Sequence, residues 1–127
     1  MAYNFLIVDD SAFVRTVFKK TLSLSNLEIG TVFEAGNGAE ALELLGRQQV
    51  DLIFLDVNMP VMDGLEFMDR LRSQQQFVHI PVIVMSTEGS RERKALLADK
   101  DVVACLRKPF TTEQVREAIE AALEQRT

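Results

Sequence analysis

Five polar side chains follow apolar runs of the sequence, at points where strands are expected to end. They are three carboxylates, a hydroxyl and an amine: Asp9, Asp10, Asp56, Ser86 and Lys108. An Asp that follows a strand is, taken singly, more often a turn or cap residue than a ligand. In open α/β sheets, however, ligands bind beyond the carboxyl ends of the strands, so we expect all five side chains to converge on one rim.

The residue types at this rim indicate a metal site that handles phosphoryl groups. Three gathered carboxylates repel one another and require a compensating cation. Oxygen ligands without His or Cys favour a hard ion, Mg2+ or alternatively Mn2+, and Lys108 adds a fixed positive charge. A carboxylate there can attack phosphorus and form an aspartyl phosphate. Asp56, at the end of a central strand, is the predicted nucleophile, while Asp9 and Asp10 serve the metal.

The elements that position these residues are predicted by short apolar runs alternating with amphipathic stretches, the pattern of a parallel sheet covered by helices. Three of the runs, FLIV, LIFL and VIVM, lack polar alternation, as in strands that bury both faces. Together with the more polar runs they predict five strands: residues 4–8, 31–35, 52–56, 82–86 and 102–106.

Helical periods between these runs predict five helices in a doubly wound α/β domain. The second is expected to start at Asn37, where Glu40 completes a capping box, and the last at Thr111 or Thr112, with Gln114 placed for a cap. The third and fourth are expected around residues 65–73 and 91–99. The first is expected to turn Arg15, Lys19 and Lys20 outward and to bury one face, formed by Val14, Val17, Phe18, Thr21 and Leu22.

Composition narrows the class of protein. A chain of 127 residues supports one domain, and we assign residues 1–127 to it. The net charge of −5 argues against direct nucleic-acid binding. No apolar run is long enough to span a membrane, no secretory signal is evident, and the single cysteine fits a reducing compartment, so we expect a cytoplasmic protein. The only histidine, His79, is expected in a surface loop rather than as a phosphate carrier.

Four segments, taken in order, resemble the receiver domain of two-component response regulators: FLIVDDS, DLIFLDVNMPVMDG, VIVMST and LRKPF. The resemblance covers essentially the whole chain and implies a flavodoxin-like fold with strand order 2-1-3-4-5. It implies that Asp56 accepts a phosphoryl group from a sensor histidine kinase or a phosphotransfer protein. The implied Mg2+ ligands are Asp9, Asp10, Asp56 and the backbone carbonyl of Asn58, with Asp9 often acting through water.

The same resemblance assigns roles around the acceptor. Ser86 and Lys108 would contact phosphoryl oxygens, and the bond before Pro109 would be cis. Asn58 and Glu88 stand at the two positions that tune hydrolysis of the acyl phosphate. Uptake and loss of the group are self-catalysed, so the chain is expected to be a switch rather than an enzyme.

The output of that switch is implied to lie on the face formed by the fourth helix, the fifth strand and the fifth helix, where partners are selected. Here the chain departs from the family, because Cys105 replaces the usual Tyr or Phe three residues before the lysine. A ring-flip readout is therefore excluded. We interpret Cys105 as a small strand residue, with a redox role as the alternative. We favour a free-standing receiver, with a receiver excised from a longer regulator as the alternative.

Three other functions are weighed against the switch. An aspartate-nucleophile phosphatase would carry Asp-x-Asp after the first strand, whereas the chain has Asp9, Asp10 and Ser11, and it would release phosphate steadily from phosphomonoesters. A flavodoxin-like cofactor binder would need a phosphate loop where these carboxylates stand, and it would be coloured. A degenerate receiver that only scaffolds would not need the complete set of acids, Ser86 and Lys108.

Overall fold

The computed structural model describes residues 2–56, 64–86, 102–108 and 110–124, and it contains one parallel five-stranded sheet. The strand order is β2-β1-β3-β4-β5, so the order implied by the family resemblance is confirmed. All four strand pairs are parallel. The strands are β1 Tyr3–Val8, β2 Ile29–Ala35, β3 Leu52–Asp56, β4 Val82–Ser86 and β5 Val102–Arg107.

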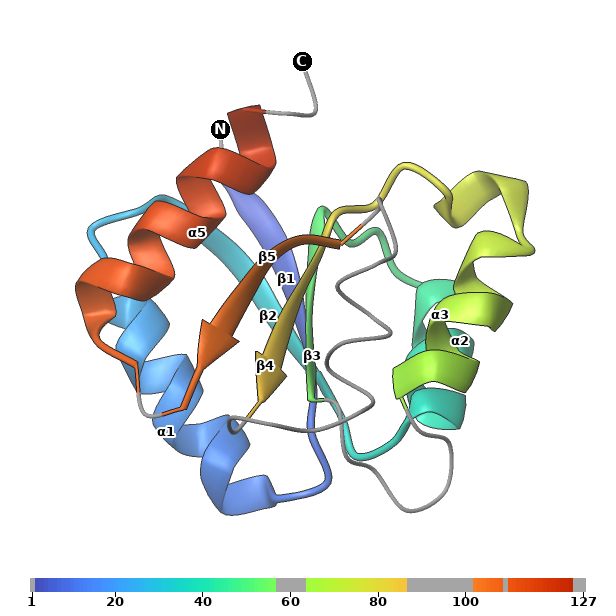
Figure 1. The fold of residues 1–127 in the computed structure, drawn as a ribbon, viewed down its shortest axis with the longest axis horizontal. Helices are drawn as coiled ribbons and strands as arrows, with labels where there is room; N and C mark the ends of the chain where they lie inside the picture. Colours follow the sequence, from blue (N-terminus) through green and yellow to red (C-terminus); the bar gives the residue numbers. More distant parts are fainter. Residues whose placement is uncertain (1, 57–63, 87–101, 109, 125–127) are drawn as a thin grey trace.

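Helices cover both faces of this sheet, which confirms the doubly wound α/β class (Figure 1). Helices α1 and α5 lie together on one face, and α2 and α3 lie on the other. The described helices are α1 Ala12–Ser23, α2 Gly38–Leu45, α3 Gly64–Arg72, the 3-10 turn η1 Gln75–Phe77, and α5 Thr112–Glu124. The helix expected around residues 91–99 lies outside the described residues. None of the described helices is long and apolar enough to cross a membrane.

The central strands bury both faces, as their unbroken apolar sequences predict. In β1, the side chains of Leu6 and Val8 enter the core under α2 and α3, while those of Phe5 and Ile7 enter the core under α1 and α5. Strands β3 and β4 alternate in the same way. Since a one-residue slip would exchange these two sets of side chains, the two cores fix the register in which the strand ends meet.

The predicted helix caps are present. The Glu40 N–H donates to Asn37 Oδ1 over 2.9 Å, and the Glu40 carboxylate accepts from the Gly36 N–H over 3.3 Å. In α5, Thr111 and Gln114 each accept the other's backbone N–H, over 3.1 and 2.8 Å. These caps satisfy amides that a helix leaves without intrahelical partners and so fix where each helix begins.

The inner face of α1 differs from the expectation at one position. Phe18 and Leu22 are buried, but Val17 is 49% exposed. At 100° per residue, Val17 lies about 120° around the helix from the midpoint between Phe18 and Leu22, so it faces solvent. The predicted face was therefore too wide.

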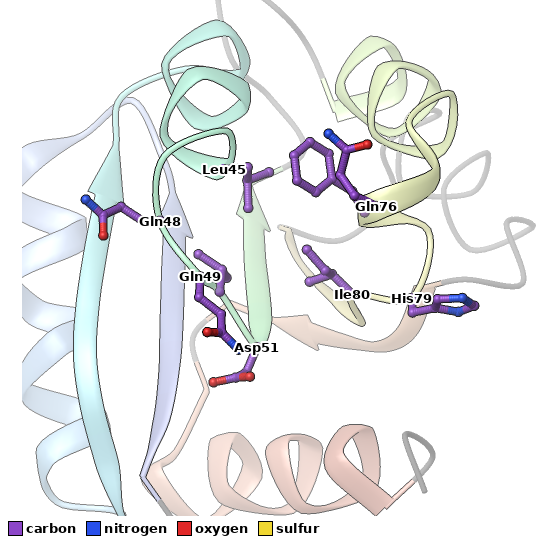
Figure 2. Close-up of a pocket in the computed structure, with 9 residues that line it drawn as sticks. Leu45, Gln48, Gln49, Asp51, Gln76, His79 and Ile80 are labelled. Carbon is purple, nitrogen blue, oxygen red and sulfur yellow. The ribbon is translucent and has the colours of Figure 1, made fainter.

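A pocket of about 300 Å³ lies at the amino-terminal end of β3 and β4, remote from the predicted site (Figure 2). Gln48 and His79 stand on either side of it, and His79 is exposed, as predicted. Beside the pocket, the Arg72 guanidinium donates to the backbone carbonyls of Phe77, Val78 and Ile80. The lining combines apolar and polar side chains: Leu45, Gln48, Gln49, Val50, Asp51, Gln76, Phe77, His79 and Ile80.

Candidate functional site

Three carboxylates meet at the carboxyl end of the sheet, where β1 and β3 are neighbours. Asp9 and Asp10 follow β1, and Asp56 is the last residue of β3. One carboxylate oxygen from each lies within 4.8 Å of the other two. Asp9 and Asp56 are 1% and 7% exposed, whereas Asp10 is exposed. The predicted convergence of the three acids is therefore present in the structure.

Asp9 is held through nearly all of its polar atoms. Its backbone N–H donates to the Ala35 carbonyl over 3.1 Å, and its Oδ1 accepts the Ser11 N–H over 2.9 Å. Its backbone carbonyl accepts a hydrogen bond from Arg15 Nη1. Its buried Oδ2 has no hydrogen-bond partner in the described structure. That atom is therefore a buried acceptor without a hydrogen bond, 3.6 Å from Lys108 Nζ.

Lys108 is the cation that the structure places between the two buried acids. Its Nζ lies 3.5 Å from Asp56 Oδ1 and 3.6 Å from Asp9 Oδ2, an ion-pair distance too long for a strong hydrogen bond. The Lys108 N–H donates to the Ser86 carbonyl over 2.9 Å. The centroid of the Phe110 ring lies 5.4 Å from that of the Phe18 ring on α1.

Ser86 ends β4 and is 2% exposed, and it pairs in register with Arg107 of β5. Its hydroxyl lies 3.9 Å from the Cys105 sulfur, within the range of a weak hydrogen bond to sulfur. Cys105 is half-buried in β5, in agreement with its interpretation as a small strand residue. The small residue thus stands directly against the predicted switch hydroxyl.

The donor set fits a hard divalent cation. The candidate ligand atoms are all carboxylate oxygens, and Lys108 lies at ion-pair distance from both buried acids. The unsatisfied Asp9 Oδ2 is a buried acceptor that such a cation would satisfy.

A group of three charged residues, Arg15, Lys19 and Glu34, lies next to the Asp9 backbone, and the sequence analysis did not predict it. Arg15 was expected outside, yet its side chain is only 17% exposed. Its Nε donates to Glu34 Oε1 over 3.1 Å, and Lys19 Nζ donates to Glu34 Oε2 over 3.0 Å. The bond from Lys19, and then that from Arg15, hold the pKa of Glu34 below its usual range. The sequence did contain a signal for this pair of cations. Arg15 and Lys19 are four residues apart, so they lie on the same side of the helix and can both reach one acid.

Three predicted positions, Asn58, Glu88 and Pro109, lie outside the described residues. The structure therefore shows where the other six predicted site residues lie, while their roles, the carbonyl ligand, the rate-tuning pair and the peptide-bond geometry stay predictions.

The sequence matches a known protein family. Residues 5–120 match the model of the response regulator receiver domain, and the chain belongs to this family. It is therefore a signalling receiver domain rather than a classical enzyme.

Chemotaxis proteins are among its relatives. The chain is 36% identical to chemotaxis protein CheY1 of Helicobacter pylori, over 93% of this chain and 94% of the relative. It is 31% identical to chemotaxis protein CheY-3 of Vibrio cholerae, over 94% and 90%. The solved structure of Vibrio cholerae CheY4 superposes with a TM-score of 0.83 at 33% identity, covering 96% of this chain and 99% of that one.

Proposed function

We propose that residues 1–127 form one receiver domain that accepts a phosphoryl group on Asp56 in the presence of Mg2+ and changes its partner-binding face in response. The observation that carries the proposal is the arrangement of Asp56 and Asp9, two buried carboxylates that share Lys108 and lie within 4.8 Å of Asp10. Membership of the receiver family supports the same reading.

Each residue has a part in the transfer. A carboxylate oxygen of Asp56 attacks phosphorus while the bond from phosphorus to the donor's histidine nitrogen breaks, which gives an aspartyl phosphate. Asp9, Asp10 and Asp56, with the Asn58 carbonyl, would hold Mg2+, which offsets charge on the phosphoryl oxygens when it is bound. Lys108 Nζ, now 3.5 Å from Asp56, supplies a positive charge to a phosphoryl oxygen from the protein side.

Ser86 is the proposed link between the acceptor and the rest of the domain. A phosphoryl group adds about −1.5 to −2 charges and strong acceptors, and the Ser86 hydroxyl would leave Cys105 to donate to one of them. Because β4 and β5 are paired at this point, that movement would alter the edge of the sheet beside α5. Cys105 offers no ring to move inward, so this response depends on Ser86 and the backbone.

Loss of the group completes the proposed cycle. Water hydrolyses the acyl phosphate at a rate that Asn58 and Glu88 tune, so the domain resets without turning over an external substrate. The proposed partners are a sensor histidine kinase or phosphotransfer protein as donor, and an output protein on the face of the fourth helix, β5 and α5. We propose that the domain acts in the cytoplasm and, with its net charge of −5, makes no direct contact with nucleic acid.

The test is the intact mass of the protein after incubation with acetyl phosphate, with and without Mg2+. The wild type is expected to gain one phosphoryl group only with Mg2+, and Asp56→Asn is expected to gain none. Asp69→Asn, an exposed acid on α3, is the matched control and should behave as the wild type.

The other outcomes also decide between readings. No gain in any folded sample would favour a degenerate receiver that only scaffolds. A gain that persists in Asp56→Asn would mean that another residue accepts the group. Steady release of phosphate from phosphomonoesters would favour the phosphatase.

A further inference from the structure

Arg15 connects the acidic rim to the edge of the sheet. Its Nη1 donates to the backbone carbonyl of Asp9, and its Nε donates to Glu34 of β2. Lys19, one turn further along α1, holds the second oxygen of Glu34. One guanidinium therefore joins α1, β2 and the end of β1, at a side chain that is 17% exposed.

This connection acts on the peptide unit between the two acids that follow β1. The Asp9 carbonyl belongs to the same planar unit as the Asp10 N–H, so its orientation sets the direction in which the chain continues to Asp10. The Asp9 N–H and Oδ1 are already held by Ala35 and Ser11. Within the part of the chain that the structure describes, the bond from Arg15 holds the Asp9 carbonyl.

We propose that Arg15 is a positioning residue for the divalent cation, with Glu34 holding its guanidinium in place. The inference rests on the proposed function for the identity of the ion. Arg15 does not contact the ion, but it orients the two acids so that the buried Asp9 Oδ2 and the exposed Asp10 carboxylate face one point. Groups that orient metal ligands from behind commonly change metal affinity by about 10- to 100-fold.

The charge of Arg15 and its positioning role predict opposite changes in Mg2+ affinity when Arg15 is removed. Arg15 is a cation near a cluster of three carboxylates. If it acted only through its charge, its removal would lower the local positive potential and tighten Mg2+ binding. If it positions the acids, its removal weakens Mg2+ binding. The sign of the change in affinity therefore separates the two roles.

The experiment measures the Mg2+ dissociation constant of Arg15→Gln, Arg15→Lys and Lys19→Gln by following backbone amide signals during titration. Arg15→Gln is expected to bind at least about 10-fold more weakly than the wild type. Arg15→Lys should fall between them, because an ammonium cannot reproduce the fork of the guanidinium. Lys19→Gln also removes one positive charge that pairs with Glu34, but Lys19 makes no hydrogen bond to Asp9. The Mg2+ dissociation constant of this variant should stay within about threefold of the wild-type value.

A second readout needs no metal. Amide hydrogen exchange at Ser11, whose N–H is held by Asp9 Oδ1, should be several-fold faster in Arg15→Gln than in Lys19→Gln without added Mg2+. Unchanged exchange at Ser11, or Mg2+ binding that is unchanged or tighter in Arg15→Gln, would overturn the proposal.

Failure of the proposed function is distinguishable from failure of this inference. A wild type that binds Mg2+ but gains no phosphoryl group would remove the switch and leave the positioning role standing if Arg15→Gln weakens the ion. If the wild type gains the phosphoryl group and Arg15→Gln binds Mg2+ as tightly as the wild type, the switch stands and the positioning role of Arg15 fails.

Discussion

The two ends of the sheet use polar side chains in different ways. At the amino end, Asn4 donates to the Gln49 carbonyl and accepts the Thr31 N–H, and the Asp51 carboxylate accepts the Asn4 N–H over 2.8 Å. Arg72 similarly closes the turn before β4 on three backbone carbonyls. Polar groups at this end mainly complete the backbone.

At the carboxyl end, like charges are gathered instead. Asp9 and Asp56 are buried beside each other, Asp10 is close by, and Asp9 Oδ2 has only Lys108 at 3.6 Å within the described structure. The same sheet therefore has one end where polar groups complete the hydrogen bonds of the backbone and another where three carboxylates are brought together. The difference indicates which end was shaped for a ligand, even though the pocket of Figure 2 lies at the other end.

The largest effect on stability is expected at the amino end. Arg72→Gln removes the guanidinium from the carbonyls of Phe77, Val78 and Ile80, and should lower the free energy of unfolding by about 2–3 kcal/mol. Urea denaturation measures this, with Arg70→Gln as the control. Arg70 forms an exposed i, i+4 pair with Glu66, and its loss should cost less than about 1 kcal/mol. Equal losses of unfolding free energy in Arg72→Gln and Arg70→Gln would show that the bonds from Arg72 to the backbone carbonyls do not stabilise this end of the sheet.

The opposite sign is expected at the carboxyl end. Asp10→Asn removes one of three repelling carboxylates from an exposed position, and should raise the unfolding free energy without metal by about 0.5–2 kcal/mol. The wild type should also gain thermal stability when Mg2+ is added, because the ion binds only the folded state, and the variant should lose most of that gain. Thermal denaturation with and without Mg2+ measures both. If Asp10→Asn is less stable than the wild type and keeps the full Mg2+ effect, Asp10 neither repels the other two acids nor binds the ion.

A smaller effect tests the group of three charged residues next to the Asp9 backbone. The pKa of Glu34 is lowered from 4.5 by Lys19 and Arg15, so its ion pairs stabilise the folded state fully above that pH. The stabilisation is lost as the pH falls below 4.5 and through the lowered pKa of the folded state. Glu34→Gln should be less stable than the wild type at pH 6 by under about 1 kcal/mol, since the Glu34 side chain is 32% exposed.

The measurement is urea denaturation of both proteins at several pH values from 6 downward. The difference between them should shrink as the solution becomes more acidic. A difference that is constant with pH would show that the ionised form of Glu34 is not what stabilises the fold.

The parts of the fold that depend on short-range patterns could be predicted from the sequence. The bounds of β3 and β4 were predicted to the residue, because their strands are fully buried and end at polar residues. The caps at Asn37 and Thr111 were also predicted, since each cap depends on residues only three positions apart. Convergence of the acids followed from the rule that places ligands at strand ends.

What could not be predicted depends on contacts between distant segments. Arg15 looked like one more exposed cation of α1, and only the packing of α1 against β2 brings it to Glu34 and the Asp9 carbonyl. The exposure of Val17 likewise depends on how α1 is rotated against the sheet, which a periodic pattern defines only within about one residue position. The strand order also came from the family resemblance rather than from residue patterns.

The register of the parallel strands has a consequence for how the sequence can change over generations. Val8 pairs with Leu55, Asp56 with Met85, and Ser86 with Arg107, so the site is assembled from residues that sit at matched heights on four strands. Loops can gain or lose residues at a cost that grows slowly with length. A single deletion inside β1 or β3 would exchange the residues of the two cores and turn the acid that follows away from its partners. Descendants of this chain are therefore expected to differ in length between strands and to differ within strands by substitution alone.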